Sequence, residues 1–270
     1  PALFAQTPIT VFEHVTVIDA TGAPPRPDVS VMVRGGLIEQ VGKVATPEGA
    51  RVVDGRGKFL IPGLWDMHVH LYGPEESLRK LAANGITGVR DMYSGVDAAA
   101  YGPWRQVPFA PRMSVAGMID GPQFKGGPSA FAVSSDEEAR TAVGLLAASR
   151  VEFIKVYSSL PREAYLGVAA EAHRIGIPFA GHVPESVSPA EAAEAGQLSQ
   201  EHLINILASC STREEELRAE RQKLLTDRDL NVMERARLFG WPREPGLFDT
   251  YDDKKCQALF GKFVDYGVWH

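Results

Sequence analysis

Two histidines, His68 and His70, stand one residue apart at the end of the apolar stretch 59–69. In a β-strand, residues i and i+2 project from the same face, so the two imidazoles would lie side by side at the carboxyl end of the strand. Neutral imidazole is a common metal ligand. The pair is therefore a candidate metal-binding site. The alternative is that each histidine is a hydrogen-bonded structural residue.

Three further candidate ligands follow, each near the end of its own apolar stretch. They are Lys155 in 153–157, His182 in 177–182 and His202 in 199–203. Recurrence at equivalent places in successive strands favours one shared site. The carboxyl ends of parallel strands converge on one rim when a sheet closes into a barrel, so the side chains would share a centre there.

The elements that must position these side chains repeat as strand, loop and helix. Strands are expected over 59–70, 86–90, 112–119, 151–157, 177–182 and 198–203. Helices are expected between them, with capping boxes that begin at Ser135 and Ser188 and with Gly85 and Gly176 beyond helix ends. Six such units predict a parallel sheet covered on both faces. Ligands at the ends of strands one, four, five and six predict a (β/α)8 TIM-type barrel rather than an open sheet.

Residues on either side of these repeats complete the expected organisation. Residues 1–60 are expected to form the amino-terminal part of a small β-sandwich, an antiparallel unit with a hairpin at Gly35-Gly36 and a further strand at 51–54. Residues 61–270 would be the barrel. A helical insertion at about 211–265 is either a solvent-exposed helical segment or a lid over the mouth of the barrel. Residues 268–270 look like the start of strand seven.

Composition limits the classes of partner. The 270 residues are 44% hydrophobic and 23% charged, as in a soluble globular protein, and carry a net charge of −6. Without a basic face, neither nucleic acid nor an anionic membrane is expected as a partner, so the ligands are small molecules or peptides. No apolar run is long enough to cross a membrane. Cys210 and Cys256 are expected to form neither a disulfide framework nor a metal site.

The first eight residues resemble the end of a secretory signal, with a cleavage point after Ala5. They predict export to the periplasm or the exterior. The alternative is a cytoplasmic protein.

The stretch 62–70, Lys155, Gly181-His182 and Glu201-His202 together resemble the amidohydrolase superfamily, specifically its imidazolonepropionase-like and prolidase-like metal-dependent hydrolases. The resemblance implies two divalent metals at the top of the barrel. His68 and His70 would hold one, and His182 and His202 the other. Lys155 would bridge both as a carbamate formed with CO2; the alternative is an inward lysine paired with a carboxylate. Zinc is the first choice for histidine-rich, thiol-free ligation, with nickel, cobalt and manganese left open.

The resemblance also implies a reaction. Two metals would lower the pKa of a bridging water and polarise a carbonyl group, which leads to hydrolysis of an amide bond in a dipeptide or N-acyl amino acid. Tyr157 lies on the same strand face as Lys155 and is either a substrate contact or a packing residue. Hydrolysis of a lactone or cyclic imide by the same site is the alternative.

One feature departs from the family. Its members carry a metal-binding aspartate at the end of strand eight, and these residues reach only the start of strand seven. Asp249, Asp252, Asp253 and Asp265 precede strand seven, so none fits that role. Because an open barrel leaves strand edges unpaired, the chain is expected to be a fragment, a truncated product or one member of a homo-oligomer. The competing hypothesis is a catalytically inactive, metal-binding partial barrel.

Overall fold

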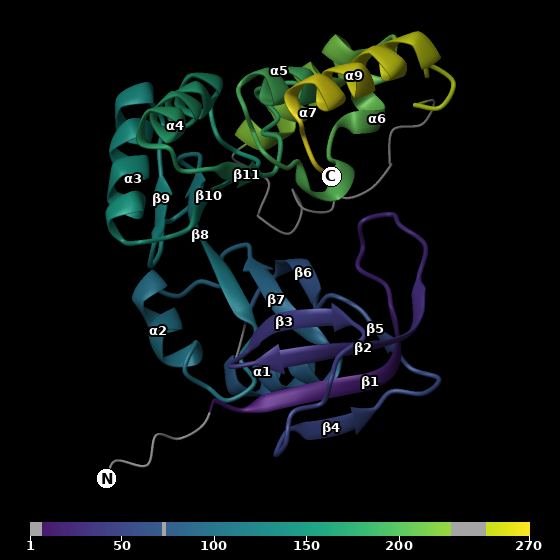
Figure 1. Ribbon diagram of the computed structural model, residues 1–270. Helices are drawn as coiled ribbons and strands as arrows, with labels where there is room; N and C mark the ends of the chain where they lie inside the picture. The colour runs from purple at the N-terminus through teal and green to yellow at the C-terminus, as the bar shows by residue number, and fades with distance from the viewer. Residues whose placement is uncertain (1–6, 72–73, 228–246) are drawn as a thin grey trace. The chain divides into compact units, whose positions relative to one another are not determined.

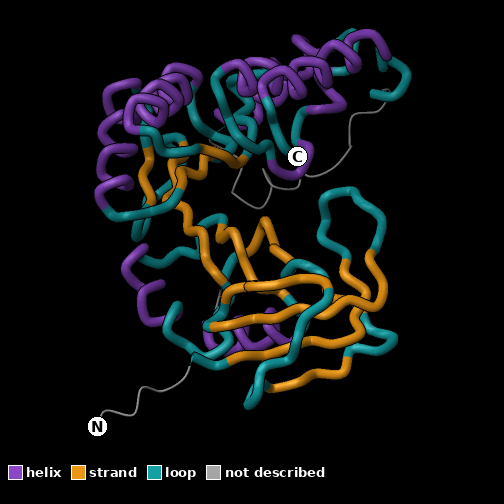
Figure 2. Tube along the Cα trace, viewed as in Figure 1, coloured by secondary structure: helices purple, strands orange, loops and turns teal. Residues whose placement is uncertain are grey.

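The computed structural model, drawn in Figures 1 and 2, describes residues 7–71, 74–227 and 247–270. Contacts within the chain divide it into two compact units, Pro1–Leu64 and Trp65–His270. The prediction of one strand over 59–70 is wrong, because β5 (Phe59–Leu60) and β6 (Leu64–Val69) are separate strands in separate sheets. Pro62 lies between them, and proline has no N–H to continue a ladder of hydrogen bonds.

The first unit is built on one five-stranded sheet, ordered β3-β2-β1-β4, with β5 also paired to β1. The bounds are β1 (Ile9–Val17), β2 (Arg26–Arg34), β3 (Leu37–Gly42) and β4 (Arg51–Asp54). The predicted hairpin between β2 and β3 is confirmed, and Gly35 and Gly36 have the positive φ values, 57° and 82°, that its turn needs. The expected antiparallel strand at 51–54 is wrong. β4 and β5 run parallel to β1, because the chain after β3 crosses to the other side of β1.

The second unit contains parallel strands curled into a half-barrel, which confirms the predicted barrel class. The sheet has the order β11-β10-β8-β7-β6, with a short strand β9 beside β8. The bounds are β7 (Ile86–Asp91), β8 (Arg112–Asp120), β9 (Ala130–Ala132), β10 (Phe153–Val156) and β11 (Phe179–Gly181). The pairs β7–β8, β8–β10 and β10–β11 are all parallel.

The sixth predicted strand is shorter than expected. Gln200 makes a parallel bridge to Gly181, and Ser199 makes one to Trp269, which marks the start of strand seven. The chain then leaves the strand in a 3-10 turn, η2 (Glu201–Leu203), in which His202 and Leu203 have left-handed φ values of 64° and 56°. Because two residues with positive φ cannot extend a strand, the predicted strand over 198–203 ends at its third residue.

Helices cover the outer face of the parallel strands, where α3 and α4 lie side by side (Figure 1). The helical elements are α1 (Pro74–Ala83), η1 (Ala98–Ala100), α2 (Tyr101–Trp104), α3 (Asp136–Ala148), α4 (Arg162–Ile175) and α5 (Pro189–Glu194). Ser135 and Ser188 cap α3 and α5 by accepting from backbone N–H groups, as predicted. Alternate strand residues face opposite sides: Ile154 packs in the cluster with α3 and α4, whereas Phe153 joins a separate cluster with Met92, Ala116 and Ala180.

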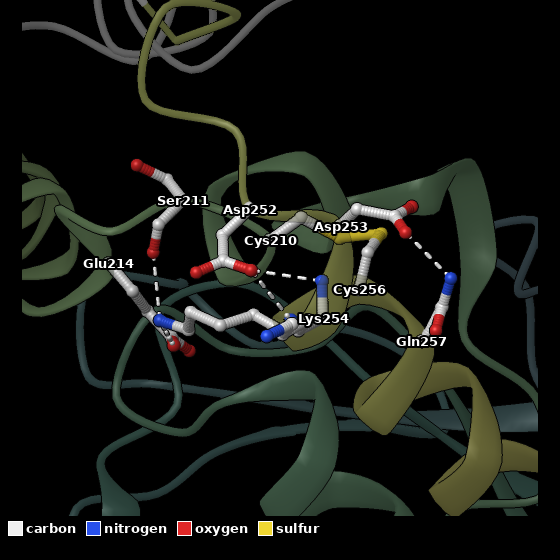
Figure 3. The surroundings of a disulfide bond; sticks show 9 residues. Cys210, Ser211, Glu214, Asp252, Asp253, Lys254, Cys256 and Gln257 are labelled. Carbon is white, nitrogen blue, oxygen red and sulfur yellow. Dashed lines mark hydrogen bonds and ion pairs between the residues drawn. A yellow bond between two sulfur atoms is a disulfide. The ribbon is translucent and has the colours of Figure 1, made fainter.

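After η2 comes the short helix α6 (Ile206–Ser209), and the helical insertion that follows contains α7 (Glu214–Thr226) and α9 (Asp253–Tyr266). Residues 228–246 of the expected insertion lie outside the described residues. Cys210 and Cys256 form a disulfide between the end of α6 and the first turn of α9 (Figure 3), so the prediction of no disulfide is wrong. The two cysteines are 46 positions apart, and only the packing of α9 against α5 and α6 brings their Cα atoms to 4.6 Å. Among the helices described, none is long and apolar enough to cross a membrane.

Candidate metal centre

Four histidines from three regions of the second unit gather at one place. His68 belongs to β6 and His70 follows it directly, His182 follows β11, and His202 lies in η2. The ring centres of His68 and His70 are 5.3 Å apart, those of His68 and His202 are 4.6 Å apart, and those of His182 and His202 are 5.1 Å apart. The structure therefore brings together the four histidines named from the sequence.

The Nδ1 atoms of three of these rings bind neighbouring groups. The Nδ1 of His68 lies 2.8 Å from Glu201 Oε2, that of His70 lies 2.6 Å from the carbonyl oxygen of Tyr93, and that of His182 lies 2.7 Å from Ser158 Oγ. A metal would then be bound through Nε2. A carboxylate or carbonyl behind a histidine is the usual support for a metal-binding imidazole, because it fixes both the ring and its tautomer.

Burial favours the neutral form of three of the imidazoles, which is the form that binds metal. Burial lowers the pKa of His182 to about 2, with the charge of Lys155 acting in the same direction. It also lowers the pKa values of His70 and His202. Desolvation disfavours the charged imidazolium, so these rings are neutral near pH 7.

Gly181 sets the direction of the chain into His182. Its φ is 130°, and a Cβ at this position would lie 2.3 Å from the carbonyl oxygen of Val156 on the adjacent strand. Only glycine fits so close an approach of two backbones. The Gly-His pair noted in the sequence therefore has a steric reason.

Lys155 is only 2% exposed and lies in β10. Burial lowers its pKa to about 8, against the charges of Glu201, Asp91 and Asp120, which raise it. Its Nζ stands 5.1 Å from the ring centre of Tyr157. Tyr157 in turn lies against His182, with ring centres 4.0 Å apart, and is 36% exposed. The structure thus places both residues beside the histidines.

The sequence pattern assigned no role to the acidic and basic residues around this cluster. Glu201 accepts hydrogen bonds from Arg90 and Ser199. Burial alone would raise the pKa of Glu201, but the hydrogen bonds from His68 and Ser199 and the charge of Arg90 outweigh it and lower the pKa to about 2. The histidines were found because each lies near the carboxyl end of an expected strand. Glu201 directly precedes His202, and Arg90 also lies near a strand end, so the same criterion could have found both.

Two buried aspartates were also missed. Asp91 ends β7 and accepts hydrogen bonds from Ser94 and from the hydroxyl of Tyr101, 2.9 Å away. These hydrogen bonds stabilise the turn that contains Tyr93, whose carbonyl oxygen lies 2.6 Å from His70 Nδ1. Asp120 ends β8 and accepts from the Ser159 N–H. Burial raises the pKa of Asp120 to about 6.

The donor set fits divalent metals, since neutral imidazoles suit zinc and its neighbours. Within the described ranges, however, no three His, Cys, Asp or Glu side chains are arranged to hold an ion. The donors are gathered but not set in a coordination geometry, so metal binding stays a prediction.

The four aspartates of the insertion do not supply the aspartate that the family places on strand eight. Asp249 lies in a turn before α9, and Asp253 and Asp265 belong to α9. Asp252 caps α9 by accepting from the N–H of Lys254, as Figure 3 shows.

Comparisons with known proteins complete the description. No protein-family model matches the chain. A dihydroorotase from Trichlorobacter lovleyi is 39% identical over 80 residues, which are 29% of this chain and 16% of that protein. One from Geobacter sulfurreducens is 38% identical over 84 residues, 31% of this chain and 17% of that protein. The matched stretch is thus less than a fifth of the length of these curated relatives.

The solved structures match nearly the whole chain at low identity. Ochratoxinase from A. niger superposes with a TM-score of 0.61 at 19% identity, over 98% of this chain and 75% of the other. A Xaa-Pro dipeptidase with bound methionine in its active site superposes with a TM-score of 0.58 at 18% identity, over 97% and 78%. These likenesses show the fold.

Proposed function

We propose that this protein is a metal-dependent hydrolase of the amidohydrolase superfamily, which cleaves an amide bond of a small substrate such as a dipeptide or an N-acyl amino acid. The observation that carries the proposal is the meeting of four imidazoles near a buried lysine, whose charge acts on three of them. Surface histidines have no reason to converge in this way, and buried lysines are rare unless paired or functional.

His68 and His70 would hold one metal, and His182 and His202 the other. Two bound metals, zinc by first choice, would supply a water of lowered pKa and a polarised carbonyl group. The chain's part is to present neutral Nε2 atoms, and the partners at the Nδ1 atoms of His68, His70 and His182 support that orientation.

Lys155 would join the two metals after reaction with CO2. Its neutral nitrogen attacks the carbon of CO2, an N–C bond forms, and one amine proton leaves to solvent. With a pKa of about 8, roughly a tenth of the amine is neutral at pH 7, against about one part in three thousand for an ordinary lysine. The product is an anion in place of a cation, which suits a metal bridge.

The substrate would contact Tyr157 and the loop 121–128. Tyr157 presents an exposed aromatic face next to His182. The loop approaches the centre through Gly127, where a Cβ would lie 2.7 Å from the Tyr93 hydroxyl, and the Tyr93 carbonyl binds His70. A cyclic substrate, such as a lactone or cyclic imide, is the second candidate, favoured by the dihydroorotase name of the curated relatives.

Hydrolysis assays with a metal count test the proposal. The protein is purified in bicarbonate with zinc, its metals are counted by mass spectrometry, and it is assayed on panels of dipeptides, N-acyl amino acids and lactones. We expect about two zinc ions and turnover of an amide. Tyr157→Ala should raise KM for that substrate and leave the metal count unchanged. Two metals without turnover of any substrate would favour the inactive metal-binding alternative, and no metal at all would refute the site.

We also propose an oxidising compartment for this protein, because structural disulfides persist in exported proteins and are rare in reducing cytosol. Thiol labelling of the protein from its native source tests this, and two reactive thiols would point to the cytoplasm. Assembly into a homo-oligomer is a further proposal, to be measured by light scattering.

A further inference from the structure

An ion pair lies inside the half-barrel next to His68. Arg90 of β7 and Glu201 of η2 are 12% and 11% exposed, and their charged atoms approach to 2.5 Å. We propose that Arg90 and Glu201 are positioning residues, which hold His68 in the tautomer that carries its proton on Nδ1 and presents Nε2 to a metal. The inference rests on the proposed function and names the residues that prepare this ligand.

Glu201 determines where the imidazole proton lies. Its Oε2 is 2.8 Å from His68 Nδ1, and its Oε1 accepts from Arg90 Nη2 and from Ser199 Oγ, at 2.5 and 2.7 Å. An ionised carboxylate can only accept, so the His68 Nδ1 must be the donor. In a neutral imidazole the other nitrogen, Nε2, then carries a lone pair.

Arg90 holds both Glu201 and the backbone beside His68. Its Nε donates to the carbonyl oxygen of Met67 at 2.7 Å, and its Nη1 donates to Ser199 Oγ at 2.8 Å. The guanidinium carbon lies 5.8 Å from the ring centre of Phe153. A rigid, planar guanidinium can reach three acceptors at once, which a lysine ammonium on a flexible stem does not reproduce. The side-chain acceptor and the neighbouring backbone of His68 are therefore fixed by one group.

Stability alone is a weak reason for such a pair. A buried ion pair can often be replaced by apolar residues of similar volume at no loss of stability. An apolar pair would fill the space between β7 and η2, but it could not choose between the two tautomers of an imidazole. The neighbouring His182 shows the contrast, because Ser158 Oγ can either donate to its ring or accept from it.

Glu201→Gln is the direct test. If the amide oxygen stays with Arg90 and Ser199, the NH2 group faces His68, whose Nδ1 must then accept and whose proton moves to Nε2. We expect zinc affinity to fall roughly 10–100-fold, the usual effect of losing such a support. Nitrogen-15 NMR of the metal-free protein should show the proton of His68 moved to Nε2.

Glu171→Gln is the matched control. Glu171 is a buried glutamate of α4 whose ion-pair partners are Arg174 on the same helix and Arg140 on α3. The Glu171→Gln substitution removes the same charge from a similar ion pair, so zinc affinity and the His68 tautomer should match those of the original chain. A Glu201→Gln protein that keeps both at their original values would overturn the inference.

Arg90→Lys tests the other member of the pair. The charge remains, but the contacts to Met67 and Ser199 are lost, so zinc affinity should fall while the proton stays on Nδ1. Unchanged affinity would remove Arg90 from the proposal.

If the variants do not fold, the unaltered protein still tests the inference about the His68 tautomer. Its metal-free spectrum should show His68 protonated on Nδ1, and a proton on Nε2 would refute the inference. If the unaltered protein binds no zinc, the proposed function fails, whereas the tautomer still reports on Arg90 and Glu201.

Discussion

Breaking the disulfide between Cys210 and Cys256 should lower the free energy of unfolding by about 4 kcal/mol. The bond closes a loop of 46 residues, and the loss of chain entropy that such a cross-link imposes on the unfolded state gives this value at 25 °C. Both cysteines are buried with Ala193, Leu259 and Phe263, so alanine replacements leave the surrounding apolar cluster in place.

Urea unfolding measures the effect in three samples. These are the original protein, the same protein with a phosphine reductant, and the Cys210→Ala/Cys256→Ala variant. The reduced protein and the variant should unfold at a similarly lowered midpoint, and the reductant should not affect the variant. A loss below about 1 kcal/mol, or two titratable thiols in the native protein before reduction, would refute the reasoning.

Three further predictions concern the site. Lys155→Met should abolish the bicarbonate-dependent part of zinc binding, counted by mass spectrometry, and two bound ions in that variant would contradict the carbamate. Gly181→Ala should cost about 1–3 kcal/mol of stability, because the residue has a φ of 130° and its new Cβ would meet the carbonyl oxygen of Val156; an unchanged melting temperature would refute this. Burial raises the pKa of Asp120 from 3.8 to about 6, so the folded state keeps a proton that the unfolded state loses between these values, and stability should fall by up to about 3 kcal/mol as pH rises through that window. Asp120→Asn should lack this part of the decline in urea unfolding between pH 3 and pH 8, and the same decline in the variant would exclude Asp120 as its source.

The sequence predicted the parts of the site that depend on local pattern. Strand periodicity placed Lys155 in one strand and His182 at the last residue of the next, and the structure has Lys155 in β10 and His182 directly after β11. His202 was placed correctly beside the other histidines but in the wrong element, since its left-handed backbone is fixed by the turn in which it lies.

What the sequence did not predict depends on contacts between distant segments. The parallel direction of β4 follows from which side of β1 the chain reaches after β3, and no local pattern records that path. The Cys210–Cys256 bond requires the docking of α9. The network of Arg90 and Glu201 joins residues 111 positions apart, so its parts were visible but their meeting was not.

The bridge between Ser199 and Trp269 bears on the order in which this chain folds. Two segments about 70 residues apart must meet, and the entropy of closing a loop rises with its length. Once Cys210 and Cys256 are joined, the shortest covalent path between the two segments falls to about 25 residues, and the closure cost falls by about 1 kcal/mol. That difference corresponds to a roughly five-fold faster encounter. In the oxidised chain, the segment at Trp269 should therefore find its place beside Ser199 sooner than in the reduced one.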